Sequence, residues 1–125
     1  MILGIGTDII EIARMKIFCE KPYYVSKIYT ENECRLAREK LSFLAGNFAA
    51  KEAVCKALGT GFRGFGAKEV EILRDELGAP YVRLYGRAEE IFFAKNASHI
   101  HVSISHCREY ASAFAVLEGN YGAMD

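Results

Sequence analysis

The amino-acid sequence predicts a single α+β domain in which a small, mostly antiparallel sheet packs against a long helix. The chain has 125 residues, about the usual size of one domain. Segments of alternating apolar residues are interspersed with segments whose apolar residues recur at helical spacing. No repeat, linker or low-complexity segment interrupts this mixture. We therefore expect one domain over residues 1–125, with a tail at 119–125 that frays.

The N-terminal segment predicts a strand followed by a helix. Residues 1–10 are mostly apolar and β-branched, which predicts a buried strand that ends at the polar step Thr7-Asp8. From Ile9 onward the apolar residues recur at helical spacing, and Pro22 ends or interrupts the helix that they predict. Asp8 is thus expected between the strand and the helix.

The middle of the chain predicts two further helices. Thr30 and Glu33 fit the capping box, in which two side chains satisfy free N–H groups at a helix start. A helix through about Lys40 is expected from this signal. The clearest helical periodicity of the chain covers residues 42–58, and Gly59 is a natural residue to end that helix.

The C-terminal half begins with a glycine-rich loop. Residues 59–66 contain four glycines, which is too many for regular structure and suits a loop that binds a ligand. Strand and helix signals alternate beyond this loop. The predicted elements are a hairpin of strands 70–74 and 81–85, a helix over 87–95, and a second hairpin of strands 100–106 and 111–117.

Composition excludes several classes of protein. Sixteen basic residues balance sixteen acidic ones, which disfavours a nonspecific nucleic-acid binder. No apolar run approaches the length of about 18 residues that a membrane span needs, and no signal peptide is apparent. The four cysteines form no C-x-x-C pair and are interpreted as buried thiols of a reducing compartment. We therefore expect a cytoplasmic protein without a membrane partner.

Asp8 is the first candidate for chemistry. At a strand end, its carboxylate could hold a divalent cation whose other coordination positions stay open to substrate and water. Asp is also a preferred residue at a helix N-cap, and a lone carboxylate rarely makes a metal site. From the residues alone, the cap is slightly the better interpretation.

Glu52 and Lys56 form the second candidate group. Their spacing of four residues puts both side chains on one helical face, where an ordinary ion pair would explain them equally well. Their location favours function, because Glu52 lies among alanines and the glycine-rich loop follows Lys56 within one turn. Two carboxylates, a lysine and a flexible loop are the parts of a Mg²⁺-dependent phosphate site.

The remaining motifs match known site motifs only partly. The loop lacks the Gly-Lys-Ser/Thr of a Walker A motif, although its amides and Arg63 could approach a phosphate. Gly4-Ile5-Gly6 lacks the third glycine of a dinucleotide fingerprint. The segment around Ser105 and His106 lacks a nucleophile elbow, which leaves His106 as a turn residue or a phosphate contact.

Three motifs together resemble one family. They are Gly4-Ile5-Gly6-Thr7-Asp8-Ile9, then Phe48-Ala49-Ala50-Lys51-Glu52-Ala53-x-x-Lys56-Ala57-x-Gly59-Thr60-Gly61, then Ser103-Ile104-Ser105-His106. In order and spacing the chain, from about Gly4 to Glu118, resembles holo-(acyl carrier protein) synthase of the 4′-phosphopantetheinyl transferase family. This resemblance implies transfer of the 4′-phosphopantetheine arm of coenzyme A to a serine of apo acyl carrier protein, with adenosine 3′,5′-bisphosphate as the other product.

The resemblance also implies the site residues. Asp8 and Glu52 would bind Mg²⁺, and Lys56 would complete the catalytic group by stabilising the charge on the departing nucleotide. The proton acceptor for the serine stays open between a metal-bound water, Glu52 and Lys56. The residues implied in coenzyme A binding are Lys51, Gly59, Thr60, Gly61, Arg63, Ser105 and His106.

Assembly and partner follow from the same resemblance. It implies a homotrimer with active sites at subunit interfaces, and a carrier protein whose acidic helix docks on the first helix of the synthase. Arg14, Met15 and Lys27 are the implied contacts. Asn47 departs from the family, where arginine is common at this position, and this puts a nucleotide-phosphate contact in doubt unless Arg63 or another basic residue compensates.

Two other classes of function are kept open. One is a non-catalytic module that binds coenzyme A or a nucleotide, for which Asn47 is the support. The other is an interaction protein in which Asp8 is a helix cap and Glu52 belongs to an ion pair. The joint presence of Asp8, Glu52 and Lys56 favours the enzyme.

Overall fold

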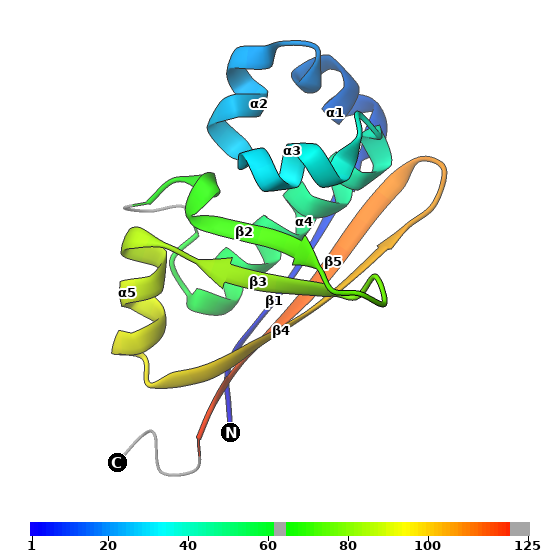
Figure 1. Ribbon diagram of the computed structural model, residues 1–125. Coiled ribbons are helices and arrows are strands. Elements are labelled where there is room, and N and C mark those ends of the chain that lie inside the picture. Colours follow the sequence, from blue (N-terminus) through cyan, green and yellow to red (C-terminus); the bar gives the residue numbers. More distant parts are fainter. Residues whose placement is uncertain (62–64, 121–125) are drawn as a thin grey trace.

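The computed structural model describes residues 1–61 and 65–120 of the chain and confirms the α+β class (Figure 1). The described elements are β1 (Ile2–Glu11), α1 (Ile12–Cys19), α2 (Pro22–Ile28), α3 (Glu31–Ala37), α4 (Leu41–Leu58), the 3-10 turn η1 (Ala67–Glu69), β2 (Val70–Arg74), β3 (Pro80–Leu84), α5 (Gly86–Ala94), β4 (Ala97–His106) and β5 (Tyr110–Gly119). The long helix, both hairpins and the helix after the first hairpin all match the sequence prediction.

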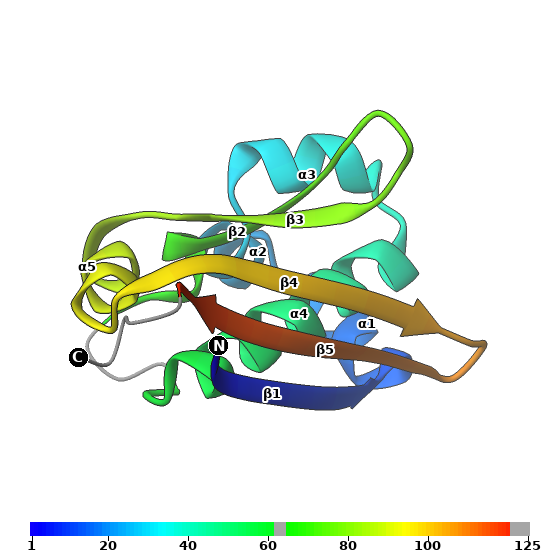
Figure 2. The same ribbon diagram turned by 90° about the horizontal axis from the view of Figure 1, so that it is seen from below.

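The strands form two antiparallel sheets. β1, β5 and β4 make a three-stranded sheet with β5 in the centre, and β2 pairs with β3 in a separate hairpin. Figure 2 shows the three-stranded sheet in front of α4, which packs across one of its faces. The expected sheet against a long helix is therefore present, with the β2–β3 hairpin as a second sheet beside it.

β1 and α4 approach each other more closely than side chains would permit. A Cβ atom on Gly4 would overlap the carbonyl oxygen of Ala57, and one on Gly6 would overlap that of Ala53. On β5, the residues that face α4 are Ala111, Ala113, Ala115 and Leu117, which are buried. Small residues on both elements thus bring the strand backbone against the helix backbone.

Apolar side chains fill two adjoining clusters. The main cluster joins α4 to the three-stranded sheet, the β2–β3 hairpin and α5. The second cluster lies among α1, α2, α3 and the N-terminal half of α4, where Figure 1 shows the three short helices grouped together. The hydroxyl of Tyr29 in this cluster donates a 2.6 Å hydrogen bond to the carbonyl of Leu44, which ties the short helices to α4.

The N-terminal third differs from the sequence prediction. β1 continues to Glu11, because its pairing with β5 extends through the Glu11–Tyr110 position, and α1 starts only at Ile12. The residues after Pro22 form a separate helix that the sequence analysis missed, with Pro22 in its first turn. The capping box of Thr30 and Glu33 is confirmed, but α3 ends at Ala37 rather than near Lys40.

The cysteines also differ from expectation. All four are free thiols, yet Cys34 and Cys107 are exposed and only Cys55 is buried. The prediction of four buried thiols was therefore wrong. Among the described residues, no helix combines the length and the hydropathy needed to cross a bilayer.

Candidate active site

Asp8, Glu52 and Lys56 come together where β1 crosses α4. Asp8 faces α4, since it lies two and four residues beyond the glycines that contact the helix, and side chains alternate along a strand. The ammonium of Lys56 lies 2.8 Å from the Thr7 carbonyl oxygen and 3.4 Å from Asp8 Oδ1. The Thr7 carbonyl was not predicted, because no side-chain motif marks a backbone acceptor.

Glu52 is the least compensated charge of this cluster. Burial raises the pKa of its carboxyl, the negative charge of Asp8 raises it further, and Lys56 partly lowers it. No hydrogen bond from a described residue reaches the Glu52 carboxylate. The cluster therefore holds two nearby carboxylates of which only Asp8 has a cation within ion-pair distance.

This geometry removes both structural explanations for these residues. Asp8 pairs with Ala113 in the middle of β1, so it is not a helix cap, and the N-cap residue of α1 is Glu11. Lys56 forms its ion pair with Asp8 on another element instead of with Glu52 one turn away. The preference for Asp8 as a cap was wrong, and the juxtaposition with Glu52 and Lys56 is a feature of the tertiary structure.

The carboxylate pair fits a hard divalent cation. Both groups offer oxygen ligands, and their mutual repulsion is of the kind that a bound cation would relieve. Within the described part of the chain, no three His, Cys, Asp or Glu side chains gather into a metal-binding group. Mg²⁺ commonly takes one or two carboxylates and completes its shell with water and substrate phosphates, so two ligands are sufficient.

The glycine turn after α4 is built differently from a phosphate-binding loop. Gly59 and Gly61 have positive φ angles of 83° and 60°, as glycine readily allows. The amides of Gly59, Thr60 and Gly61 all donate to carbonyls of the last turn of α4, at Cys55 and Lys56. These three amides are thus already used, whereas a Cβ atom on Gly61 would meet no described atom within 4 Å. Arg63 lies outside the described residues.

Lys51 is not available to a phosphate. Its side chain is fully buried and its ammonium contacts Glu33 Oε1 at 2.7 Å and the carbonyls of Val70 and Ala67 at 2.6 and 3.1 Å. Three acceptors use all three of its donors. Burial lowers its pKa, which Glu33 opposes. The assignment of Lys51 to coenzyme A binding is therefore corrected: this lysine joins α4 to α3 and β2.

Asn47 lies in the same buried cluster of polar side chains as Lys51 and Glu33. Its amide nitrogen donates to Glu33 Oε2 at 2.8 Å and to the Ile72 carbonyl at 2.9 Å, while its oxygen accepts from Arg74 at 2.8 Å. The Arg74 guanidinium in turn lies over the Phe43 ring. Asn47 thus has a complete set of partners inside the chain and is not exposed to a nucleotide.

Ser105 and His106 lie at the exposed end of β4, away from the carboxylates. Ser105 pairs with Ser112 of β5, which pairs on its other side with Ile9 of β1. Its side chain therefore lies on the face opposite α4, where Ile9 is also exposed. Within one copy of the chain, β5 separates these residues from the Asp8 strand.

Of the three predicted partner contacts on α1 and α2, two are exposed and one is buried. Arg14 and Lys27 are exposed, but Met15 is only 4% exposed and packs in the second apolar cluster, so its assignment as a partner contact was wrong. The exposed neighbour of Met15 is instead Ile17. A groove of about 280 Å³ lies here and is lined by Arg14, Ile17, Phe18, Lys21 and Tyr24.

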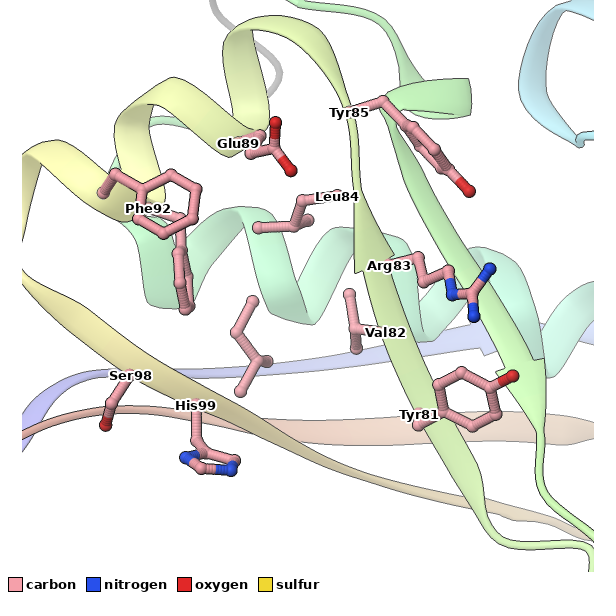
Figure 3. A pocket seen from close by; sticks show the side chains of 11 residues that line it. Tyr81, Val82, Arg83, Leu84, Tyr85, Glu89, Phe92, Ser98 and His99 are labelled. Atoms are coloured by element: carbon pink, nitrogen blue, oxygen red, sulfur yellow. The ribbon is translucent and has the colours of Figure 1, made fainter.

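A second groove, of about 560 Å³, lies between β3, α5 and β4 (Figure 3). Val82, Leu84 and Phe92 point into it, and Ser98 and His99 stand on the β4 side. None of the described site residues lines this groove. Arg83 and Glu89 also line this groove, but it has no pair of carboxylates that could hold a cation, and we place the chemistry at the Asp8 cluster instead.

Comparison with known proteins identifies the family. A model of the 4′-phosphopantetheinyl transferase superfamily matches residues 4–115. The holo-[acyl-carrier-protein] synthase of Lachnoclostridium phytofermentans is 50% identical over 118 residues, which cover 94% of this chain and 97% of that protein. The corresponding synthase of Clostridium novyi is 49% identical over 122 residues, with 94% and 88% covered.

Solved structures agree with this result. The Helicobacter pylori holo-[acyl-carrier-protein] synthase in complex with coenzyme A has a TM-score of 0.81 at 31% identity and covers 91% of this chain and 99% of the other. The Bacillus anthracis synthase in complex with CoA (3′,5′-ADP) has a TM-score of 0.80 at 36% identity, with 96% and 99% covered. The chain therefore belongs to the 4′-phosphopantetheinyl transferase superfamily. Its activity is that of a phosphopantetheinyl transferase, as the motifs predicted.

Proposed function

We propose that this chain converts apo acyl carrier protein to the holo form at the cluster of Asp8, Glu52 and Lys56. The carrier serine oxygen attacks the phosphorus that bears the pantetheine arm of coenzyme A. A phosphodiester bond forms, the phosphorus–oxygen bond to the nucleotide breaks, and adenosine 3′,5′-bisphosphate leaves with the electron pair. The single observation that carries the proposal is the meeting of these three charged side chains, from β1 and α4, beside an open surface.

Lys56 is the residue that we assign to the leaving group. Its ammonium has three donors, of which the Thr7 carbonyl and the Asp8 carboxylate take two. No described residue accepts from the third, and the side chain is 52% exposed. A positive charge held in place in this way stabilises the negative charge that grows on the departing nucleotide.

Glu52 and Asp8 would hold Mg²⁺. When bound, the ion supplies positive charge that polarises the coenzyme A diphosphate. One oxygen of the Glu52 carboxylate would bind the ion, and the other, which no described residue engages, is the atom that we propose to accept the serine proton.

We propose that the active unit is a homotrimer. The face of the three-stranded sheet opposite α4 exposes Ile5, Ile9 and Phe114 to 59%, 66% and 47%. Burial of such a face against other copies is favourable. Ser105 lies on the same face, and His106 follows it at the strand end, so we assign these two residues to a coenzyme A contact made across the subunit interface.

The carrier protein docks, in this proposal, on the groove of α1 and α2. Arg14 and Lys21 flank an apolar surface of Ile17, Phe18 and Tyr24. The ammonium of Lys27 lies over the ring of Tyr23 at 4.7 Å, which holds this charge at the edge of the same surface. An acidic amphipathic helix complements that combination.

The cytoplasmic location predicted from the unpaired cysteines stays part of the proposal.

Intact-mass spectrometry of apo acyl carrier protein tests the reaction directly. Incubation with the protein, coenzyme A and Mg²⁺ should add about 340 Da, the mass of one phosphopantetheine arm. Chelation by EDTA and the Glu52→Gln variant should each abolish the gain, whereas Glu90→Gln, which changes an exposed glutamate on α5, should keep it.

The outcomes separate the alternatives. Coenzyme A binding without any mass gain on several carrier proteins would favour a non-catalytic binding module. A gain that survives both EDTA and Glu52→Gln would contradict the metal assignment while leaving the transferase intact.

A further inference from the structure

Lys95 lies beside the glycine turn, although nothing in the sequence near it marks a site. It is the C-cap residue of α5, and a Cβ atom on Gly59 would stand 3.6 Å from the Lys95 ammonium. In both ribbon views α5 and the C-terminal end of α4 lie at the same end of the molecule. No local sequence pattern marks Lys95, because its contact joins two helices that the loop and the first hairpin separate in the chain.

The Lys95 ammonium is unpaired within the described chain. The described ion pairs engage Lys51, Lys56, Arg87 and His101, and no carboxylate pairs with Lys95. Its helix is held firmly at the other end, because the Glu69 carboxylate accepts from the amides of Arg87 and Ala88. A fixed helix therefore presents a free cation at the turn.

The Gly59–Gly61 turn can bind an anion only if a cation lies beside it. The C-terminus of a helix carries partial negative charge from its last carbonyls, which repels phosphate. The amides of Gly59, Thr60 and Gly61 are used by those carbonyls, and Lys56 points back to Thr7 and Asp8. Among the described residues at this turn, Lys95 is the cation that no described carboxylate or carbonyl engages.

We infer that Lys95 is a binding residue for a phosphate group of the nucleotide half of coenzyme A, which it contacts over the Gly59–Gly61 turn. The inference rests on the proposed function, because that function supplies the anionic ligand. The phosphate belongs either to the diphosphate or to the 3′ position. In both cases the absence of a side chain at Gly59 and Gly61 lets the ligand lie close to the turn while Lys95 neutralises it.

Steady-state kinetics of Lys95→Ala, Lys95→Arg and Arg87→Ala test this assignment. Arg87 is the matched control, an exposed cation at the opposite end of the same helix. Lys95→Ala should raise the KM for coenzyme A about tenfold, which corresponds to about 1.4 kcal/mol. Its kcat and its KM for the carrier protein should stay near the wild-type values. Lys95→Arg should recover most of the affinity, and Arg87→Ala should behave as wild type.

Dephospho-coenzyme A, which lacks the 3′-phosphate, identifies the group. If Lys95→Ala leaves the KM for this analogue unchanged, Lys95 contacts the 3′-phosphate; if both KM values rise equally, it contacts the diphosphate. An unchanged KM for coenzyme A with a lowered thermal midpoint would overturn the inference, since it is the result expected of a lysine that only caps α4.

Calorimetric binding of adenosine 3′,5′-bisphosphate keeps this test separate from the proposed function. Loss of binding in Lys95→Ala supports the inference even if the wild-type protein transfers nothing to a carrier. Equal binding by wild type and Lys95→Ala, together with normal transfer and an unchanged KM for coenzyme A, would refute the binding role of Lys95 and leave the proposed function intact.

Discussion

Lys51 and Lys56 show how one helix gives two lysines opposite environments. Lys51 is fully buried with Glu33, whereas Lys56 is half exposed beside Asp8. Five residues along a helix turn a side chain by about 140°, so the two lysines point toward different elements. The sequence predicted the helix that carries both lysines, but which lysine meets solvent depends on where α3 and β2 pack, and no local pattern contains that information.

Glu52→Gln should stabilise the metal-free protein at neutral pH. The folded state raises the pKa of Glu52, so the folded chain binds this proton more tightly than the unfolded chain does. The wild type is therefore penalised at pH values above the folded pKa, and the penalty fades as the pH falls through that pKa. Because Glu52 is partly exposed, we expect a rise in thermal midpoint of less than about 4 °C.

Thermal unfolding between pH 4 and pH 8 measures this effect. The difference between Glu52→Gln and wild type should be largest near neutral pH and should shrink toward acid. Added Mg²⁺ should raise the midpoint of wild type but not of the variant. A variant that is less stable than wild type at neutral pH without metal would show that Glu52 has a favourable partner in the folded chain.

At the scale of elements, the sequence predicted the helices and strands that have a regular apolar periodicity. It missed the strand end that is set by pairing with a distant segment. Periodicity located α4, α5 and both hairpins, because their apolar faces are continuous. The end of β1 was placed too early, since Glu11 is held in the strand by its partner Tyr110 near the other end of the chain. Asp8 was consequently assigned to a cap, although its role depends on the alignment of β1 with α4.

Gly6→Ala should damage both stability and activity. The added methyl group would meet the Ala53 carbonyl oxygen, which belongs to the helix backbone and cannot rotate away. Separation of β1 from α4 should cost at least about 2 kcal/mol and should also move Asp8 away from Glu52. Chemical denaturation together with the transfer assay measures the two effects.

Gly66→Ala is the matched control for that substitution. An added Cβ atom at Gly66 meets no described atom within 4 Å, and its backbone has φ −95°. This variant should lose little stability. Equal losses from Gly6→Ala and Gly66→Ala would argue that glycine flexibility, rather than close packing of β1 on α4, explains the N-terminal motif.

At the scale of the whole molecule, one copy leaves the three-stranded sheet covered on one side only. α4 covers one face, while Ile5, Ile9 and Phe114 remain exposed on the other. The sequence placed Ile5 and Phe114 in strands and Ile9 at the start of a helical pattern, and periodicity alone does not distinguish a core face from an interface face. Assembly was therefore predicted from the family resemblance, and the exposed face is where we propose that the copies meet.

Ile9→Glu should dissociate the proposed trimer. A charge on this face would be buried without a partner on assembly, which is strongly unfavourable. Light scattering should give three chain masses for wild type and one for the variant, with unchanged circular dichroism. Leu77→Glu, at a leucine that is 95% exposed in the β2–β3 turn, should remain trimeric. A wild-type mass of one chain, or equal behaviour of both variants, would contradict the trimer.

The pairing of β1 with β5 also has a consequence for biosynthesis. Asp8 is translated long before its partner in the sheet, Ala113 on β5. β1 cannot complete its pairing until β5 has been translated, because β5 is its neighbour in the sheet. The position of the Asp8 carboxylate on α4 is therefore fixed only after β5 has been made, and a product that stops before β5 should lack the assembled cluster of Asp8, Glu52 and Lys56.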